Sequence, residues 1–363
     1  MVDAIRPPEA FIVHGHAPLN AEPPLSKLRS AFVTPQELLY IRSHGDIPVV
    51  DPRTHRVAVS GLVSRPFDFT VGELKGRFAS RSVKAAMQCA GNRRADMRSV
   101  RSVSGDPWAG GAIGHAVWSG VSLAEVLNSS GCRDGDDLHV AFEALDLAET
   151  DDGAAPYGVS IPLAKALSRD VLLAYAVNGG DLTPEHGFPL RVVVPGYAGV
   201  RSPKWLSRIT VQNRPSQAFQ QARDYKLFPP DMRPDTQDLS RGITIDEMPV
   251  NSAICEPEPG ARLKAGRLAL RGYAVASGRL IARVDISGDG GRHWVQAEIE
   301  PQDHSPWSWF FWNGALDLPP GEHELAVRAW DAAGQTQPAL PDDTWNFKGY
   351  LSASWHRIRV AVD

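Results

Sequence analysis

The chain has 363 residues, more than a single hydrophobic core usually organises, and we therefore expect two domains. Its 38 basic and 42 acidic side chains give a net charge of −4, so the overall charge gives no reason to expect a nucleic-acid partner. Hydrophobic residues make up 43% of the chain, but no run approaches the roughly 18 apolar residues that cross a bilayer, which excludes a membrane-spanning protein.

The amino-terminal segment, residues 1–25, does not resemble a secretory signal peptide. Acidic residues, two histidines and several prolines stand where a signal peptide has a charged tip and an apolar core. We therefore expect a soluble protein, with the cytoplasm as the favoured compartment. His14 and His16 belong to this proline-rich arm, which we interpret as a solvated segment rather than a metal site.

The chain up to about residue 230 mixes two kinds of hydrophobic pattern. Strand-like runs occur at Val57–Gly61, Leu138–Phe142 and Arg191–Val194. Helix-like runs occur between them, at Leu123–Asn128 and Leu163–Leu167. This mixture predicts a domain of the α+β class.

A proline-rich, polar stretch at Phe228–Gly242 has the composition of a linker. We place the domain boundary near Pro234, which divides the chain into residues 1–233 and 234–363. After the boundary, short alternating segments are separated by Gly and Pro turns, a pattern that predicts a β-sandwich of the immunoglobulin type. The aromatic run Trp307–Trp312 alternates along one predicted strand, so we expect it in the sandwich core or at an interface.

Cys89 lies in the most unusual stretch of the sequence. An apolar run ends at this cysteine and is followed closely by Arg93 and Arg94, whose positive charges should favour the thiolate. A thiolate here suits a nucleophile, a redox centre or a ligand for a soft metal, and a buried structural cysteine is the alternative. The other two cysteines lie far away in sequence, so we expect structural roles for them and no disulfide framework.

Two further segments place cations beside conformationally special residues. His186–Trp205 carries several basic side chains around an apolar strand and a Gly-rich turn, and Leu39–Asp51 carries Arg42 and His44 before a proline. Guanidinium groups bind phosphate and other oxyanions through paired hydrogen bonds. Taken alone, His186–Trp205 is better explained by solvated surface charges and Leu39–Asp51 by an ordinary loop. Because both fall in the same predicted domain as Cys89, we interpret them as converging on one anionic ligand.

Several long motifs resemble the signature segments of the sulfite oxidase family. They read QCAGNRR at 88–94, HGFPLRVVVPG at 186–196 and WNFKGYLSASWHRIRV at 345–360, and the opening at 20–51 is similar to the haem-free, plant-type members. The resemblance covers about Asn20 to Val360. It implies an α+β domain that holds one molybdenum–molybdopterin cofactor, followed by an immunoglobulin-like domain through which two chains form a homodimer.

The resemblance also implies which residues bind the cofactor. Cys89 is similar in position to the cysteine that ligates molybdenum, and a soft thiolate suits that metal. The cofactor-binding residues implied by the motifs are Tyr40, Ile41, Arg42, Ser43, His44, Cys89, Asp146, His186, Arg191, Ser202, Pro203 and Lys204.

The activity that the resemblance implies is the oxidation of sulfite to sulfate by oxo transfer. The electrons pass to an external acceptor, either oxygen or a c-type cytochrome, since we expect no haem or flavin domain in this chain. In these roles the cations neutralise the oxyanion, the tyrosine donates a hydrogen bond and the tryptophan walls the pocket against water. The implied catalytic residues are Cys89, Arg42, Arg94, Trp108, Asp224, Tyr225 and Lys348.

Two positions depart from the usual pattern of the family. Lys348 stands where a pocket arginine is expected, and Ser104 stands where a lysine is expected. An ammonium is a point charge rather than a bidentate fork, so we expect these changes to alter affinity more than reaction type. A retained cation at Lys348 favours sulfite over nitrate, and a nitrate reductase-like oxidoreductase is the alternative. The arginine-flanked cysteine argues against a third hypothesis, a carrier or adhesion protein without enzymatic activity.

Overall fold

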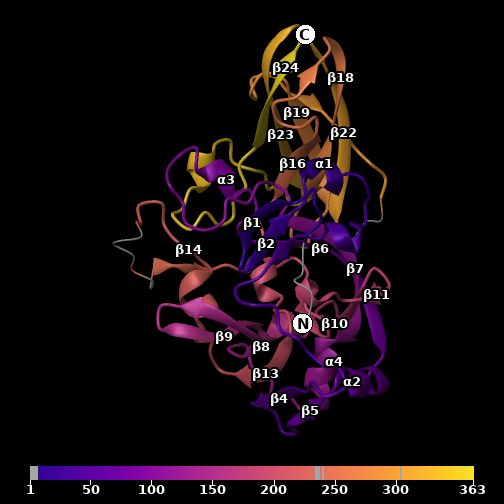
Figure 1. Ribbon diagram of the computed structural model, residues 1–363, viewed down its shortest axis with the longest axis vertical. Coiled ribbons are helices and arrows are strands. Elements are labelled where there is room, and N and C mark those ends of the chain that lie inside the picture. Colours follow the sequence, from indigo (N-terminus) through magenta and orange to yellow (C-terminus); the bar gives the residue numbers. More distant parts are fainter. Residues whose placement is uncertain (1–6, 234–237, 239–240, 303–304) are drawn as a thin grey trace.

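The computed structural model describes residues 7–233, 238, 241–302 and 305–363. Figure 1 shows a mixed body of sheets and short helices, with a β-sandwich formed by the last third of the chain above it. The predicted fold class, an α+β domain followed by an immunoglobulin-like sandwich, is confirmed. Among the helices described, none is long and apolar enough to cross a membrane. The boundary predicted near Pro234 lies outside the described residues.

Two five-stranded sheets form the first body, and side chains from both, such as Val140 and Leu173, share one buried core. In the first sheet, β13 runs parallel to β4, and all other neighbouring strands of the sheet are antiparallel. In order, this sheet consists of β5 (Phe67–Phe69), β4 (Val57–Gly61), β13 (Leu206–Gln212), β8 (His139–Thr150) and β9 (Gly153–Pro162). The second consists of β11 (Gly180–Asp181), β10 (Leu172–Val177), β7 (Ile113–Ser122) and β6 (Ser80–Gln88), with β12 (Arg191–Val193) also paired to β10.

Short helices and small sheets complete the first body. The helix α2 (Val71–Arg77) begins at a capping box, in which the Thr70 hydroxyl accepts the Glu73 N–H and the Glu73 carboxylate accepts the Thr70 N–H. The other α-helices are α1 (Leu25–Leu28), α3 (Arg94–Met97), α4 (Leu123–Ser129) and α5 (Leu163–Ala166). Single turns of 3₁₀ or π helix are η1 (Gln36–Leu38), η2 (Pro184–His186), η3 (Gly199–Arg201), η4 (Gln220–Asp224) and η7 (Pro341–Thr344). The small sheets are β1 (Ile12–His16), β2 (Leu19–Glu22) and β3 (Ile41–Arg42), and β14 (Lys226–Leu227) with β15 (Ile243–Thr244).

The second body is a sandwich of two sheets whose inner faces share one apolar cluster. The cluster joins Leu270 and Trp312 of one sheet to Val284 and Val327 of the other. One sheet has the order β16 (Asn251–Glu256), β18 (Gly266–Val275), β22 (Trp309–Leu318) and β21 (Glu298–Ile299). The other has the order β17 (Arg262–Leu263), β24 (His356–Val362), β23 (Gly321–Asp331), β19 (Ile281–Ser287) and β20 (Val295–Gln296).

The aromatic run at the start of β22 joins the two bodies. Successive side chains of a strand point to opposite faces, so Phe310 and Trp312 enter the sandwich core while Trp309 and Phe311 face the first body. There they pack with Ile113 of β7, and the Trp309 indole donates a hydrogen bond to the Phe32 carbonyl. The run was expected in the sandwich core or at an interface, and its two faces occupy one of these places each.

His356 lies buried inside the sandwich and accepts a hydrogen bond across it. Its Nδ1 accepts the backbone N–H of Ile254 at 3.0 Å, so the ring serves as a neutral acceptor. Burial, together with the nearby positive charge of Arg93, lowers the pKa of His356 to about 4, although Asp96 acts in the opposite direction. The folded state therefore prefers the uncharged ring.

We predict that His356 makes the protein less stable in acid. The pKa of His356 is about 4 in the folded protein, whereas an ordinary histidine titrates at about 6.5. The stabilising contribution of the buried neutral ring is therefore fully present above about pH 6.5. The contribution is lost as the pH falls toward 4, by on the order of 3 kcal/mol in full. Urea unfolding at about pH 7.5 and about pH 5 measures this loss, which His356→Gln should reduce while keeping an acceptor for Ile254. The exposed His16 provides the control His16→Gln, and equal pH dependence in all three proteins would refute the prediction.

Candidate functional site

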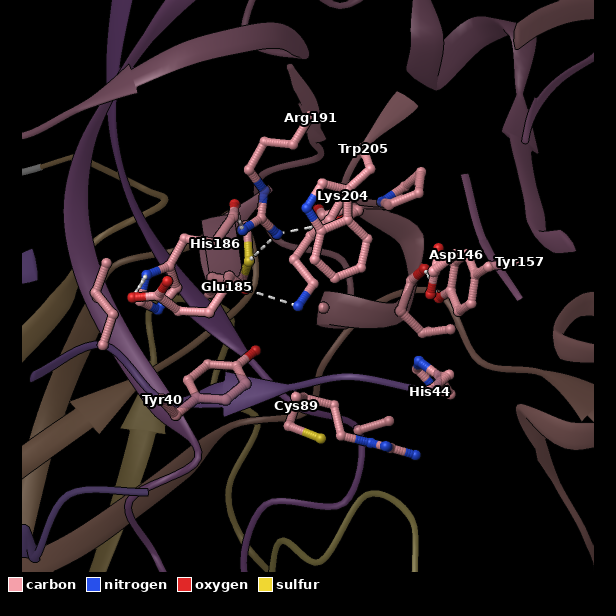
Figure 2. Close-up of a pocket in the computed structure, with 18 of the residues that line it drawn as sticks. Tyr40, His44, Cys89, Asp146, Tyr157, Glu185, His186, Arg191, Lys204 and Trp205 are labelled. Atoms are coloured by element: carbon pink, nitrogen blue, oxygen red, sulfur yellow. Dashed lines mark hydrogen bonds and ion pairs between the residues drawn. The ribbon is translucent and has the colours of Figure 1, made fainter. Parts of the chain in front are cut away.

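A pocket of about 730 Å³, partly open to solvent, lies in the first body, and we call it the inner pocket. Figure 2 shows side chains from separate segments of the chain pointing into it, with Cys89 at one end and Arg191, His186 and Lys204 toward the other. It contains most of the residues that the sequence motifs indicated. Those that line it are Tyr40, Arg42, His44, Cys89, Asp146, His186, Arg191, Ser202, Pro203, Lys204 and Tyr225.

A second, more open pocket of about 1160 Å³ shares Arg42 and His44 with the first, and we call it the outer pocket. Three more of the predicted residues, Arg94, Asp224 and Lys348, line it. Its walls combine the β1–β2 hairpin, the segment around Ser104 and the loop that holds Lys348 and Tyr350. The outer pocket is therefore built from parts of the chain that are far apart in sequence.

Cys89 directly follows β6, and its backbone N–H donates to the Ala112 carbonyl at 2.9 Å. The side chain is buried and lines the inner pocket. Burial raises the pKa of the thiol, while the positive charges of Arg42 and Arg94 lower it. The expectation that neighbouring charges favour the thiolate is thus wrong for the protein alone, because loss of hydration outweighs them. A positively charged metal would shift the balance back toward the thiolate.

Arg93, which the sequence placed beside the thiol, points away from it. The residue is fully buried with a left-handed backbone (φ 63°), and its guanidinium binds Asp96 and the second body. Its Nη1 donates to the Asn251 side chain at 2.9 Å and to the Ser252 carbonyl at 3.2 Å. Arg93 is therefore a link between the two bodies rather than a site residue.

Arg94 is held in the outer pocket by two carbonyl groups. Its Nε donates to the carbonyl of Lys348 and its Nη1 to that of Asp106, both at 3.0 Å. Gly105 and Gly349 lie against the side chain with φ of 88° and 63°, where side chains are rarely tolerated. A Cβ atom at Gly349 would come within 2.5 Å of Arg94 Cγ. These two glycines leave the space that the arginine occupies.

The basic end of the inner pocket is crowded and poorly hydrated. Arg191 donates to the carbonyls of His186 and Ser202 at 2.9 and 3.0 Å, and burial lowers its pKa to about 10. Burial, together with the positive charges of Lys204 and Arg191, lowers the pKa of His186 to about 3. His186 is thus neutral, and its buried Nε2 has no partner among the described residues.

Lys204 lies between this basic end and Asp146. Its Nζ donates to the Ser43 hydroxyl at 3.2 Å and to the Glu185 carbonyl at 2.8 Å. Burial lowers the pKa of Lys204, Arg191 lowers it further, and Asp146 opposes the shift. Burial raises the pKa of Asp146, with Lys204 acting in the opposite direction. Both charged forms are costly here without a further polar ligand.

Five side chains form a continuous chain of contacts from the inner to the outer pocket. The His44 Nε2 lies 2.6 Å from the Tyr225 hydroxyl, and the Tyr225 ring stacks on Tyr350 at 5.0 Å between centroids. The Tyr350 hydroxyl donates to Asp224 at 3.2 Å, and Lys348 Nζ donates to the same oxygen at 2.9 Å. The positive charge of Lys348 is therefore already paired with Asp224.

Three of the predicted residues line neither pocket. Trp108 is fully buried and packs in one cluster with Cys89 and Ala112, so its role as a wall of the substrate pocket stays a prediction. Ile41 is buried in β3, which pairs with β2. Ser43 acts indirectly, through its hydroxyl contact with Lys204. Arg201, a cation of the same basic segment, is also buried, and it pairs with Asp246 instead of the inner pocket.

The structure adds residues that sequence reasoning missed. Tyr157 lines the inner pocket with its ring 4.8 Å from His44, and Gly199 lies where a Cβ would meet the Tyr40 hydroxyl at 2.7 Å. No pattern within β9 marks Tyr157. His14 lines the outer pocket with a nearly buried side chain, so the interpretation of its segment as a solvated arm is wrong at this residue.

The inner pocket fits a phosphorylated pterin cofactor. Its basic end offers two cations and a neutral, unpartnered imidazole nitrogen, which match phosphate oxygens and polar ring atoms. The close approach at Gly199 leaves a cleft that a side chain would fill. At the opposite end the Cys89 sulfur supplies a soft ligand of the kind that a thiolate-binding metal prefers. The fold and the site thus define an oxidoreductase of the molybdopterin-binding class.

Comparisons with known proteins agree with this class. Residues 44–220 match the model of the oxidoreductase molybdopterin binding domain, and residues 243–363 match that of the Mo-co oxidoreductase dimerisation domain. The chain is 43% identical to sulfite oxidase of Gallus gallus, over 95% of this chain and 76% of that protein. It is 41% identical to sulfite oxidase of Arabidopsis thaliana, over 96% and 93% respectively. The chain belongs to the sulfite oxidase family.

Two other relatives show the breadth of this similarity. Nitrate reductase [NADH] 1 of Phaseolus vulgaris is 38% identical over 96% of this chain, which covers 42% of that protein. The crystal structure of the sulfane dehydrogenase SoxCD from Paracoccus pantotrophus superposes with a TM-score of 0.79 and 26% identity, over 98% of this chain and 86% of that chain. The shared architecture therefore occurs in proteins with more than one named activity.

We predict that Lys204→Met has opposite effects on stability and cofactor retention. Burial and Arg191 both disfavour the ammonium, so the cofactor-free variant should melt no lower than the wild type despite losing two hydrogen bonds. A bound phosphate would lose its cation, so molybdopterin content should fall several-fold, roughly as for loss of one charged hydrogen bond. Thermal unfolding of cofactor-free protein and molybdopterin content measured side by side test this. A large loss of stability without cofactor would show that Lys204 is structural.

Proposed function

We propose that this protein oxidises sulfite to sulfate at a molybdenum held by molybdopterin and Cys89. One observation carries the proposal. The inner pocket, which fits the cofactor, shares Arg42 and His44 with an outer pocket that adds Arg94 and Lys348. A small dianion entering from solvent would therefore meet positive charges before it reaches the Cys89 end. The overall reaction adds one oxygen to the sulfur and releases two electrons.

The two arginines would bind the oxyanion. Arg42 is held by the Asn20 side chain at 3.2 Å and by the Ser43 carbonyl, and Arg94 by the carbonyls already described. Neither of these contacts neutralises the guanidinium charge, so both charges remain available to a ligand. Lys348 contributes less directly because Asp224 already shares its charge. Fixed donors of this kind need no rearrangement when negative charge arrives.

Tyr225 and His44 would supply hydrogen bonds at the junction of the two pockets. Burial raises the pKa of Tyr225 to about 12, so its hydroxyl stays protonated and can donate to a substrate oxygen. Burial and the charge of Arg42 hold the pKa of His44 well below its usual value, so the ring stays neutral. The pair can therefore orient a substrate without adding charge.

The cofactor, when bound, supplies the oxo group that sulfite sulfur accepts and takes up the two electrons. The residues that would hold it from the lining of the inner pocket are Tyr40, Arg42, His44, Cys89, Asp146, His186, Arg191, Ser202, Pro203 and Lys204, and Ile41 and Ser43 of the same motif lie next to them in sequence. Oxygen or a c-type cytochrome would then accept the electrons. Two chains would associate through the second body, which matches a dimerisation domain. The cytoplasm stays the predicted compartment, and cell fractionation would test it.

The test is a single preparation assayed for molybdenum content, sulfite oxidation and nitrate reduction, for the wild type and for Cys89→Ser. The wild type should hold about one molybdenum per chain and oxidise sulfite, with oxygen and a c-type cytochrome compared as acceptors. The serine variant should lose the activity, since a hydroxyl is a poor soft ligand. Cys255→Ser is the matched control, because that thiol is buried in the second body and away from both pockets.

Other outcomes would reject the proposal in different ways. Wild-type protein that carries molybdenum but turns over only nitrate would support the nitrate reductase alternative and show that Lys348 does not select sulfite. Folded protein that takes up no molybdenum when cofactor is supplied would refute an enzyme of this class. Full activity in Cys89→Ser would refute the ligand assignment alone.

We predict that Gly349→Ala weakens sulfite binding. The added methyl would press on Arg94 Cγ and displace its guanidinium, so KM for sulfite should rise about tenfold, as for loss of one charged hydrogen bond. Gly334→Ala is the control, because Gly334 has a similar φ of 79° with no atom near the added methyl. It carries the same backbone strain without the contact. Equal KM values in the two variants would show that Arg94 does not bind the substrate.

A further inference from the structure

His14 is a titratable group of the outer pocket that the mechanism above does not use. It lies on β1, lines the outer pocket and packs edge-on against Trp108 at 4.7 Å between ring centroids. Its Nε2 lies 2.8 Å from a carboxylate oxygen of Glu22, which is fully buried on β2. A histidine held this firmly at the mouth of an anion pocket is unexpected in a merely solvated arm.

Glu22 fixes which nitrogen of the ring carries hydrogen. Its two oxygens also accept the backbone N–H groups of Ala109 and Gly111, at 2.6 and 2.8 Å, so the carboxylate acts as an acceptor throughout. Nε2 must therefore carry the hydrogen that it shares with Glu22. A neutral imidazole has only one N–H, so the opposite nitrogen, Nδ1, becomes a donor only when the ring is protonated.

Nδ1 is placed to meet a ligand. It makes no hydrogen bond with any residue that the structure describes, so it is the polar atom of this ring that is left for a ligand. The same side chain lines the pocket that carries Arg42 and Arg94. A dianion in this pocket would therefore find a further donor at Nδ1 when the ring is charged.

The charges around the ring do not cancel this effect. Glu22 is the acidic group in direct contact, and it binds the opposite side of the ring. Asp224, one of the acidic groups of the pocket, is already paired with Lys348. The other charged or titratable groups that line the pocket are Arg42, His44, Arg94, Asp106, Glu149 and Tyr350.

We infer that His14, oriented by Glu22, is a proton-dependent binding residue for the dianionic oxyanion of the outer pocket. When protonated it donates Nδ1–H to the bound anion and adds one positive charge, and when neutral it does neither. Affinity for a dianion should thus be greater on the acidic side of the histidine titration. The inference rests on the proposed function for the identity of the anion, while the binding itself is independent of turnover.

Sulfate is the probe, because it remains a dianion across the range in which histidine titrates. Its binding to the molybdenum-loaded protein is measured by calorimetry and as competitive inhibition, from about pH 5.5 to about pH 8.5, a range in which histidine side chains change charge. Wild-type affinity should fall about tenfold across this range, as expected for loss of one charged hydrogen bond. His14→Asn should bind sulfate about tenfold more weakly at the acidic end and show a flatter profile.

The control is His16→Asn, which changes the exposed histidine two residues away on the same strand. It should retain the wild-type profile. If His14→Asn fails to fold, His14→Gln offers a neutral donor of greater length, and it should also lose the pH dependence. A pH dependence that survives in the folded His14 variant overturns the inference, as does wild-type affinity that does not change with pH. Absence of sulfite turnover in the wild type would instead refute the proposed function.

Discussion

The buried guanidinium of Arg93 is the constraint on which the rest of the site depends. It crosses from the loop after Cys89 to Asn251 and Ser252 at the start of the sandwich. A buried charge that lost these partners would be strongly destabilising, so the loop cannot move without breaking the contact between the two bodies. The left-handed backbone at this residue turns the chain so that Arg93 faces the sandwich while Arg94 faces the outer pocket.

The second body is therefore part of the site as well as its support. The Lys348 carbonyl holds the Arg94 guanidinium, and the Leu351 N–H donates to the Ala90 carbonyl next to Cys89. Tyr350, which lies in the same segment as Lys348 and Leu351, stacks on Tyr225 of the first body. The loop at 345–351 thus comes from the second part of the chain, yet it contacts residues of the first body. These contacts join the two bodies at the outer pocket, where substrate would bind.

Sequence patterns predicted the fold well and the roles of single residues less well. Hydrophobic periodicity marked β4 and α4 because these elements bury one face in a local, repeating pattern. Motif resemblance marked the residues of the inner pocket, which surround Cys89 and Lys204. It could not show that Arg93 turns away, because the direction of a side chain depends on one backbone angle and on a partner some 160 residues later in the chain.

The remaining errors concern burial, which no local pattern encodes at these positions. His14 was expected to face solvent, but its side chain is nearly buried and packs against Trp108. The thiol of Cys89 was expected to be acidified by its neighbours, but its desolvation depends on walls contributed by distant segments. The division of labour between the pockets has a further consequence. Residues of the first body line the inner pocket, whereas Lys348 and Tyr350 of the loop at 345–351 line the outer one, so substitutions of these two residues would reshape the outer pocket and leave the lining of the inner pocket unchanged.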